Sequence, residues 1–93
     1  MEFVWDMCKA AANLRKHGVS FEEAQTVFVD ADALRIFDPD HSVDEDRFIL
    51  LGLSSVLRVL VVCHCYREND AVIRIISARK ATKMEAQTYA MRK

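Results

Sequence analysis

The sequence has little glycine and proline, with two glycines and one proline in 93 residues. This composition excludes collagen-like, linker and low-complexity segments. The longest apolar runs, FILLGL and VLVVC, are much shorter than the roughly 18 residues of a membrane-spanning helix. The N-terminal stretch MEFVWDMCKAAANLRK lacks the basic and apolar regions of a signal peptide, so we expect a cytoplasmic protein without a membrane segment.

Cysteine is also scarce, and the three residues at positions 8, 63 and 65 are an odd number. Without a secretory signal, this predicts free thiols in a reducing compartment. The triplet Cys63, His64 and Cys65 suggests a metal site at first sight. In a strand, however, side chains alternate between faces, so the two cysteines point away from the histidine. We therefore predict no metal at this triplet.

The acidic segment DPDHSVDED at positions 38–46 superficially resembles a calcium-binding loop. A calcium loop of this kind needs glycine at its sixth position and glutamate at its twelfth. Here those positions hold Val43 and Ile49. We predict neither a metal nor another cofactor, and the sequence leaves the role of His41 in this loop open.

The composition is that of a globular protein, with 52% hydrophobic and 29% charged residues. A chain of this length predicts one domain, covering residues 1–93. Such a domain buries about 65% of its unfolded surface, which is enough for one small core.

Apolar periodicity and turn signals predict the order β-α-α-β-β-β-β-α, an α+β domain with helices on one face of a small antiparallel sheet. The first helix begins after Asp6, presents Met7, Ala10, Ala11 and Leu14 on its apolar face, and ends at Gly18. Capping boxes open the second helix at Ser20 and the last helix at Thr82. The predicted strands cover residues 3–5, 33–37, 47–54, 57–66 and 71–78.

The strand at 57–66 predicts which face of the sheet is the core. Its odd positions, from Leu57 to Cys65, are all apolar. Its even positions are apolar in the middle and polar at the ends, where His64 and Tyr66 lie. We therefore expect the odd face to be the core and the even face to be a partly covered surface with polar groups at its rim.

Charge is unevenly distributed along the chain, although the formal net charge is only −1. Residues 20–46 contain nine acidic residues and one arginine, whereas residues 71–93 contain six basic residues and one glutamate. The basic segment could face a polyanion, or it could be neutralised by the acidic segment in the folded chain.

Several stretches together resemble the BrnT family of toxins from bacterial type II toxin–antitoxin systems. These stretches are FVWD at 3–6, KAAANLRKHGVSFEEA at 9–24, DHSVDEDRF at 40–48, LGLSS at 51–55 and RIISARKATKMEAQTY at 74–89. The resemblance implies a fold similar to the RelE ribonucleases and metal-independent cleavage of RNA. It also implies inhibition of growth or translation and neutralisation by a BrnA-like ribbon-helix-helix antitoxin, with a heterotetramer containing two antitoxins as one expected assembly. DNA would then be contacted only through the antitoxin.

RNA cleavage without a metal needs a general base, a general acid and positive charge near the phosphate. Arginine suits the charge because its planar guanidinium can pair with two phosphate oxygens. The candidate catalytic residues are Arg74, Arg79, Arg47, His64 and Glu45. The candidate RNA-binding residues are Lys16, Lys80, Tyr66 and Lys83, of which Lys16 and Tyr66 are also acid–base candidates.

The arginines also have a structural explanation, because each can form an ion pair on the surface. His17 lies in the last turn of the first predicted helix, where we expect it to complement the helix dipole. Two classes of function remain. The first is an endoribonuclease toxin, and the second is a catalytically weak module that binds the antitoxin and tunes repression of its operon. Growth arrest that depends on Arg74 and Arg79 is expected only of the first.

Overall fold

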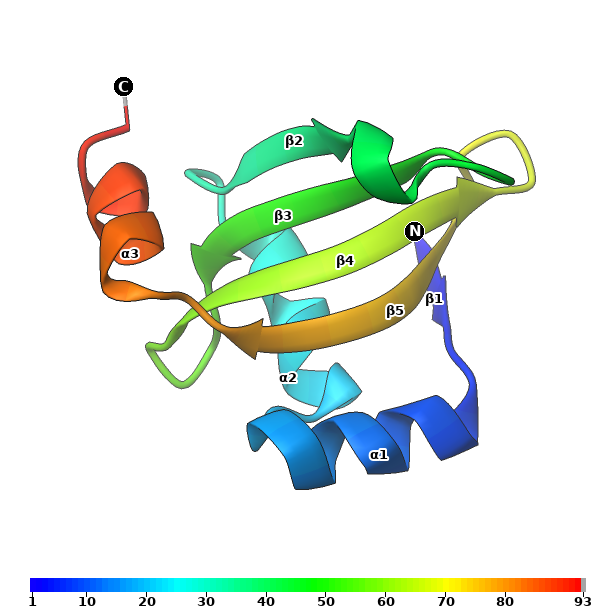
Figure 1. The fold of residues 1–93 in the computed structure, drawn as a ribbon, viewed down its shortest axis with the longest axis horizontal. Coiled ribbons are helices and arrows are strands. Elements are labelled where there is room, and N and C mark those ends of the chain that lie inside the picture. Colours follow the sequence, from blue (N-terminus) through cyan, green and yellow to red (C-terminus); the bar gives the residue numbers. More distant parts are fainter. Residues whose placement is uncertain (93) are drawn as a thin grey trace.

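Five strands form one sheet in the computed structural model of the chain, which describes residues 1–92. Across the sheet the strand order is β1-β5-β4-β3-β2 (Figure 1). The strands are β1 (Glu2–Val4), β2 (Leu34–Asp38), β3 (Arg47–Leu53), β4 (Val59–Arg67) and β5 (Val72–Lys80). The helices are α1 (Met7–His17), α2 (Phe21–Thr26) and α3 (Lys83–Ala90), with short 3₁₀ helices at Val27–Val29 and Pro39–His41. The predicted α+β class is confirmed. No helix within residues 1–92 is long and apolar enough to cross a membrane.

The sheet is mixed, so the prediction of a purely antiparallel sheet is wrong. Strands β2, β3, β4 and β5 pair antiparallel in sequence order. Strand β1 instead pairs parallel with β5, with Glu2 opposite Val72 and Val4 opposite Arg74. The two neighbours lie at opposite ends of the chain, and nothing in a three-residue apolar stretch specifies the direction of its partner.

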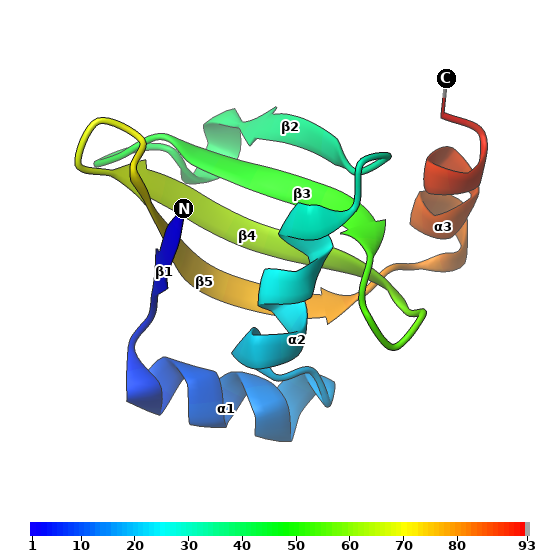
Figure 2. The same cartoon turned by 180° about the vertical axis from the view of Figure 1, so that it is seen from behind.

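The main core lies between the sheet and α2, which covers the face seen in Figure 2. Phe21, Ala24 and Val27 from this helical segment are fully buried against the sheet. Strand β4 contributes its even positions, Leu60 and Val62, to this core. The prediction that the odd positions form the main core is therefore wrong. The apolar odd positions line the other, more open face of the sheet.

A smaller apolar cluster occupies that other face. Tyr89 of α3 packs there with Leu51 and Val61. The hydroxyl of Tyr89 donates a hydrogen bond of 2.6 Å to Asp30 Oδ2, which ties α3 to the segment after α2. The helices thus lie on both faces, contrary to the prediction that they share one. In Figure 1, α3 lies beside the C-terminal end of β3 and the N-terminal end of β4.

Helix α1 begins and ends as predicted but presents a different face to the sheet. Asp6 caps its N-terminus, and Gly18 ends it with a left-handed φ of 68°. However, Met7 and Leu14 are 79% and 51% exposed, whereas Asn13 is buried. Its side-chain amide donates to the Val19 and Ala78 carbonyls at 2.9 and 2.8 Å, and its oxygen accepts from the Ala78 amide at 3.1 Å. Of the predicted apolar face, only Ala10 packs against the core, so the apolar spacing of α1 predicted its buried face only in part.

Helix α1 docks on β5 just beyond a bulge in that strand. Cys63 lies opposite Ser77 and His64 lies opposite Ile75, so Ile76 is an extra residue on β5. Strand β1 pairs with β5 only up to Arg74. Beyond this point Asn13 takes the place of a neighbouring strand for Ala78, because it bonds both backbone groups of that residue.

Candidate active site

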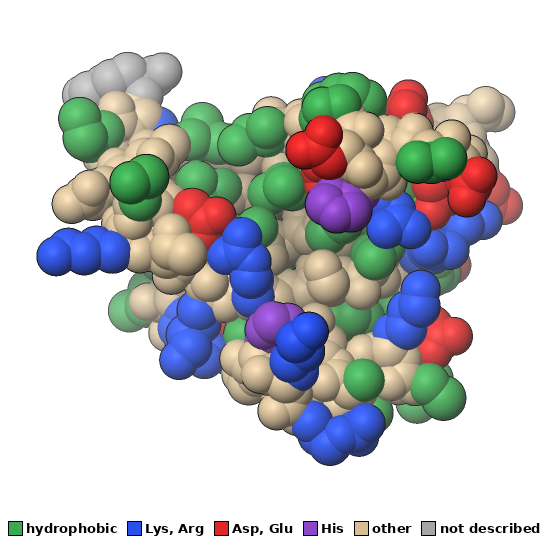
Figure 3. Space-filling view, viewed as in Figure 1, with side chains coloured by type: hydrophobic (Ala, Val, Ile, Leu, Met, Phe, Trp, Pro, Cys, Tyr) green, Lys and Arg blue, Asp and Glu red, His purple; other side chains and the backbone are tan. Residues whose placement is uncertain are grey.

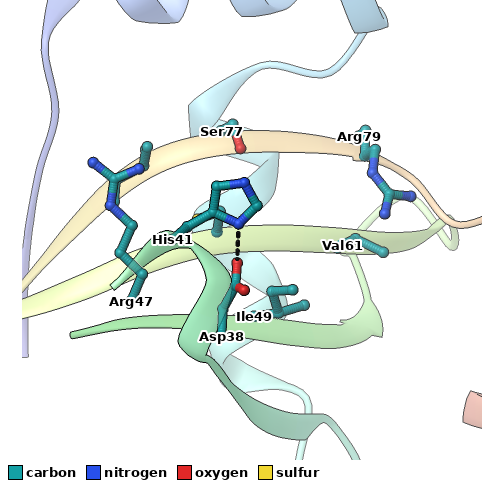
Figure 4. A pocket seen from close by; sticks show the side chains of 9 residues that line it. Asp38, His41, Arg47, Ile49, Val61, Ser77 and Arg79 are labelled. Atoms are coloured by element: carbon teal, nitrogen blue, oxygen red, sulfur yellow. Dashed lines mark hydrogen bonds and ion pairs between the residues drawn. The ribbon is translucent and has the colours of Figure 1, made fainter. Parts of the chain in front are cut away.

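A pocket of about 250 Å³ opens on the face of the sheet opposite α2. Strands β3 and β4 supply its apolar floor, which includes Ile49 and Val61. Its polar side chains are Asp38, His41, Arg47, Ser77 and Arg79, together with the thiol of Cys63. In Figure 4 the imidazole of His41 lies over the sheet, with Arg47 on one side and Arg79 on the other. The pocket therefore combines a titratable imidazole with two guanidinium groups.

The segment from Asp38 to Arg47 holds His41 over the sheet. Asp38 is the last residue of β2, and Pro39 starts the 3₁₀ turn that ends at His41. The hydroxyl of Ser42 donates to the Asp38 carbonyl and accepts from the Arg47 amide at 2.9 Å. These bonds close the loop on the first residue of β3.

His41 and Asp38 form an imidazole–carboxylate pair, with 2.9 Å between His41 Nδ1 and Asp38 Oδ2. An ionised carboxylate only accepts hydrogen bonds, so Nδ1 carries the hydrogen and donates it. In neutral His41 the Nε2 lone pair is then free to accept a proton. The histidine side chain is 68% exposed while the aspartate is 13% exposed, so the base is accessible and its partner is shielded.

Arg79 is held at the other end of the pocket by helix α3. Its two terminal nitrogens donate to the two carboxylate oxygens of Glu85 at 2.8 and 2.9 Å. Glu85 also accepts from the Thr82 amide at 2.8 Å, as the second half of the predicted capping box. The hydrogen bonds from Arg79 lower the pKa of Glu85 to about 2 against the opposing effect of burial, and Glu85 raises the pKa of Arg79.

Arg47, Arg67 and Arg74 share one carboxylate, that of Glu45. The nearest nitrogen–oxygen distances are 3.9 Å for Arg47, 3.4 Å for Arg67 and 3.3 Å for Arg74. The Nε of Arg47 is buried and has no hydrogen-bond partner within the described residues. One negative charge therefore faces three positive ones, and this group keeps a positive excess beside the pocket.

The structure brings only part of the predicted site together. Arg47 and Arg79 line the pocket. Arg74 and Glu45 are not among its lining residues and instead bond to each other. Lys80 and Lys83 are exposed and do not line it either, whereas Lys16 lines a neighbouring pocket.

The strand alternation predicted that His64 lies at the rim of the sheet, but the structure shows it fully buried. Its ring packs against Phe28 and Phe48, and its Nδ1 lies 3.2 Å from the Val62 carbonyl oxygen. Burial lowers the pKa of His64, because the charged imidazole would lose its hydration. The hydroxyl of Tyr66 accepts a hydrogen bond from Arg35 at 3.1 Å, in a separate pocket. Neither residue is placed to act in the pocket of His41.

The space-filling view in Figure 3 shows the pocket face. Lysine and arginine side chains gather at the sides of this face and below its centre. The acidic segment 20–46 neutralises the basic segment 71–93 only in part. The ion pairs between them are Arg74 with Glu45 and Arg92 with Asp32.

Sequence reasoning did not identify the Asp38–His41 pair as a functional site. The available signal was the spacing of an aspartate and a histidine three residues apart around a proline, which favours a tight turn. The same segment also resembles a calcium-binding loop superficially. Only the path of the loop back over β3 shows that His41 faces a pocket.

Together the fold and the pocket define a class: a small α+β domain whose open sheet face presents a histidine–aspartate pair between two arginines. The chain belongs to the BrnT family, because residues 5–85 match the model of the ribonuclease toxin, BrnT, of type II toxin–antitoxin systems. The resemblance inferred from the motifs is thus confirmed. Membership implies an RNA substrate and an antitoxin protein as partner.

A solved structure supports the fold. The crystal structure of the ribonuclease toxin BrnT from Brucella abortus matches with a TM-score of 0.67 and 24% sequence identity. The match covers 89% of this chain and 99% of that chain. Comparison with curated protein sequences gives no match.

Proposed function

We propose that this chain is a metal-independent endoribonuclease that cleaves RNA in the pocket of His41. The observation that carries the proposal is the Asp38–His41 pair placed between Arg47 and Arg79. In this proposal His41 is the general base, water in the open pocket is the acid, and the two arginines supply positive charge for the phosphate.

In the proposed step, His41 Nε2 takes the proton of a ribose 2′-hydroxyl. The 2′-oxygen forms a bond to the adjacent phosphorus while the bond from phosphorus to the 5′-oxygen breaks. The departing 5′-oxygen takes a proton from a water molecule in the open pocket, and the hydroxide left behind takes the proton from His41 Nε2, which restores the neutral imidazole. The products are a 2′,3′-cyclic phosphate and a free 5′-hydroxyl. Asp38 keeps the imidazole in the tautomer with a free Nε2 and stabilises the imidazolium that forms.

Arg47 and Arg79 are proposed to stabilise the negative charge that develops on the phosphorane. Each presents a planar guanidinium, which pairs well with phosphate oxygens. Arg79 reaches the pocket already oriented by Glu85, so little side-chain freedom remains to be lost when RNA binds. Arg74 acts more remotely in this proposal, through its shared carboxylate with Arg47.

Metal independence is supported by the type of residues present. Residues 1–92 contain no cluster of three or more histidine, cysteine, aspartate or glutamate side chains suited to a metal ion. The positive charge near the phosphate comes from arginines instead. We expect purified protein to cleave RNA in excess EDTA and to leave 2′,3′-cyclic phosphate ends. Activity that appears only after addition of Mg²⁺ or Mn²⁺ would contradict the proposal.

We further propose that cleavage inhibits translation and growth, and that a BrnA-like ribbon-helix-helix antitoxin neutralises the toxin, with two antitoxins in a heterotetramer. Expression alone should arrest growth, and His41→Ala should relieve the arrest. If the wild-type chain binds antitoxin and represses its operon but neither cleaves RNA nor arrests growth, the alternative of a weakly catalytic binding module is correct.

A further inference from the structure

A second hollow of about 240 Å³ lies beside the active-site pocket, between α1 and β5. Helix α1 lines it with Lys9, Asn13, Lys16 and His17, and β5 lines it with Ile76 and Ser77. Ile76 and Ser77 also line the pocket of His41. The bulge of β5 is therefore the shared wall of two adjoining hollows.

The charge on this side of α1 has no partner in the fold. Helix α1 contains Lys9, Arg15, Lys16 and His17 but no acidic residue. None of these four side chains forms an ion pair within residues 1–92. By contrast, the arginines at 47, 58, 67, 74, 79 and 92 all face carboxylates. Helix α1 thus presents positive charge that no ion pair among the described residues neutralises.

The position of this charge is fixed by Asn13. Its three hydrogen bonds, two of them to Ala78, join the middle of α1 to the strand just after the bulge. Lys9 and Lys16 lie seven residues apart and on the same side of the helix as Asn13, since all three line the hollow. Seven residues rise about 10.5 Å along a helix. Lys9 and Lys16 thus place two positive charges along one side of α1, and we call this pair the basic track.

We propose that this track is a second anion subsite, which binds a phosphate of a neighbouring nucleotide while the scissile phosphate lies in the pocket of His41. The inference rests on the proposed ribonuclease function and extends it to substrate length. A strand cut in the first hollow must continue on both sides of the broken bond. The wall that the two hollows share consists of Ile76 and Ser77, so no carboxylate separates the first hollow from Lys9 and Lys16 there.

Two substrates test the proposal. One is a dinucleoside monophosphate, which has only the scissile phosphate, and the other is a longer single-stranded oligonucleotide with the same cleaved step. We expect the wild type to prefer the longer substrate in kcat/KM. In Lys9→Ala/Lys16→Ala this preference should fall about tenfold, through KM. Arg15→Ala is the matched control, because Arg15 is an exposed cation on the same helix but does not line the hollow.

Binding of a single-stranded DNA, which lacks the attacking 2′-hydroxyl, gives a second measurement. The slope of log affinity against log salt should become shallower by about 0.7 for each phosphate that the double variant no longer neutralises. An equal preference for the longer substrate in wild type and double variant would overturn the subsite. So would normal RNA kinetics combined with weaker antitoxin binding, because the track would then belong to the protein partner. Absence of cleavage by the wild type on both substrates would instead contradict the proposed function.

Discussion

At the scale of single residues, His41 and His64 have opposite surroundings. His41 is exposed and paired with Asp38, whereas His64 is fully buried among aromatic rings. We predict that His41→Ala lowers kcat for RNA cleavage by about 100-fold or more, the usual contribution of a general base. His64→Phe should remain active, because a phenylalanine can occupy the same aromatic cluster.

Initial rates on one RNA oligonucleotide check this prediction, with circular dichroism to confirm that both variants fold. Asp38→Asn is a further test, since an amide in place of the carboxylate no longer fixes the imidazole tautomer. Its kcat should fall while KM changes little. A folded His64→Phe variant without activity, beside an active His41→Ala variant, would show that the base is assigned to the wrong histidine.

The thiols give a second prediction at this scale. Cys8 is exposed, Cys65 is buried, and burial raises the pKa of the half-buried Cys63. A raised pKa leaves less of the reactive thiolate near neutral pH. We therefore expect one thiol to react rapidly with a thiol reagent in the native protein, and all three to react in urea. Mass spectrometry of the early product should place the label on Cys8, and rapid labelling of Cys63 and Cys65 would contradict the structure.

Residue identity alone predicted half of the candidate site. Arg47 and Arg79 could be selected because a guanidinium suits phosphate wherever it lies on the surface. The Asp38–His41 pair could not, because the position of His41 depends on where the loop after β2 folds. His64 was placed at the rim, which is wrong for a related reason: alternation in β4 gives two faces, and only the packing of α2 decides which face is buried.

At the scale of elements, local signals were reliable where the interacting groups are close in sequence. The caps at Asp6, Ser20 and Thr82 form as predicted. At Ser20 only half of the capping box forms, because the Glu23 side chain bonds to Arg58 and Ser54 instead. The parallel pairing of β1 and the docking of α1 through Asn13 depend on residues more than sixty positions away, which no local pattern encodes.

Helix α3 gives a pH-dependent prediction. The pKa of Glu85 is lowered from 4.5 to about 2, chiefly by its hydrogen bonds to Arg79. A carboxylate with a lowered folded-state pKa stabilises the fold above its unfolded value, and this contribution is lost as pH falls through the folded value. Glu85→Gln should therefore be less stable than the wild type at pH 7. The difference should shrink as pH decreases from about 4.5 to 2.

Urea unfolding of both proteins at a series of pH values measures this difference, and the comparison cancels the titration of other carboxylates. In an Arg79→Ala background the same substitution should show a much weaker dependence on pH, because the main cause of the shift is gone. A wild-type advantage that stays constant down to pH 2 would show that Glu85 is not held ionised by Arg79.

At the scale of the whole molecule, the ion pairs determine which charges are left for partners. The acidic segment at 20–46 binds Arg58, Arg67, Arg74 and Arg92 within the fold through Glu23, Glu45 and Asp32. Helix α1 carries basic residues outside these ion pairs, and lysine and arginine side chains gather on the pocket face in Figure 3. A nearly neutral protein can therefore present a surface suited to a polyanion.

The antitoxin must silence this surface, and covering it is the most direct way. A carboxylate can occupy the place of a phosphate, because the same guanidinium geometry accepts both. We predict that antitoxin and RNA compete for the toxin and that Arg79→Ala weakens both interactions. Removing one charge-assisted hydrogen bond costs about 1.5–3 kcal/mol, which corresponds to a rise in Kd of about tenfold or more.

Calorimetry of the toxin variants against the antitoxin tests this prediction, and Glu85→Gln is the matched control. It breaks the same ion pair as Arg79→Ala but leaves the guanidinium in place. If the guanidinium itself contacts the antitoxin, only Arg79→Ala weakens binding. If both variants bind more weakly, the antitoxin recognises the docked position of α3. If both variants bind the antitoxin with unchanged affinity while Arg79→Ala abolishes RNA cleavage, direct occlusion at Arg79 is wrong. The antitoxin then binds elsewhere, for example on the first two helices or a free sheet edge.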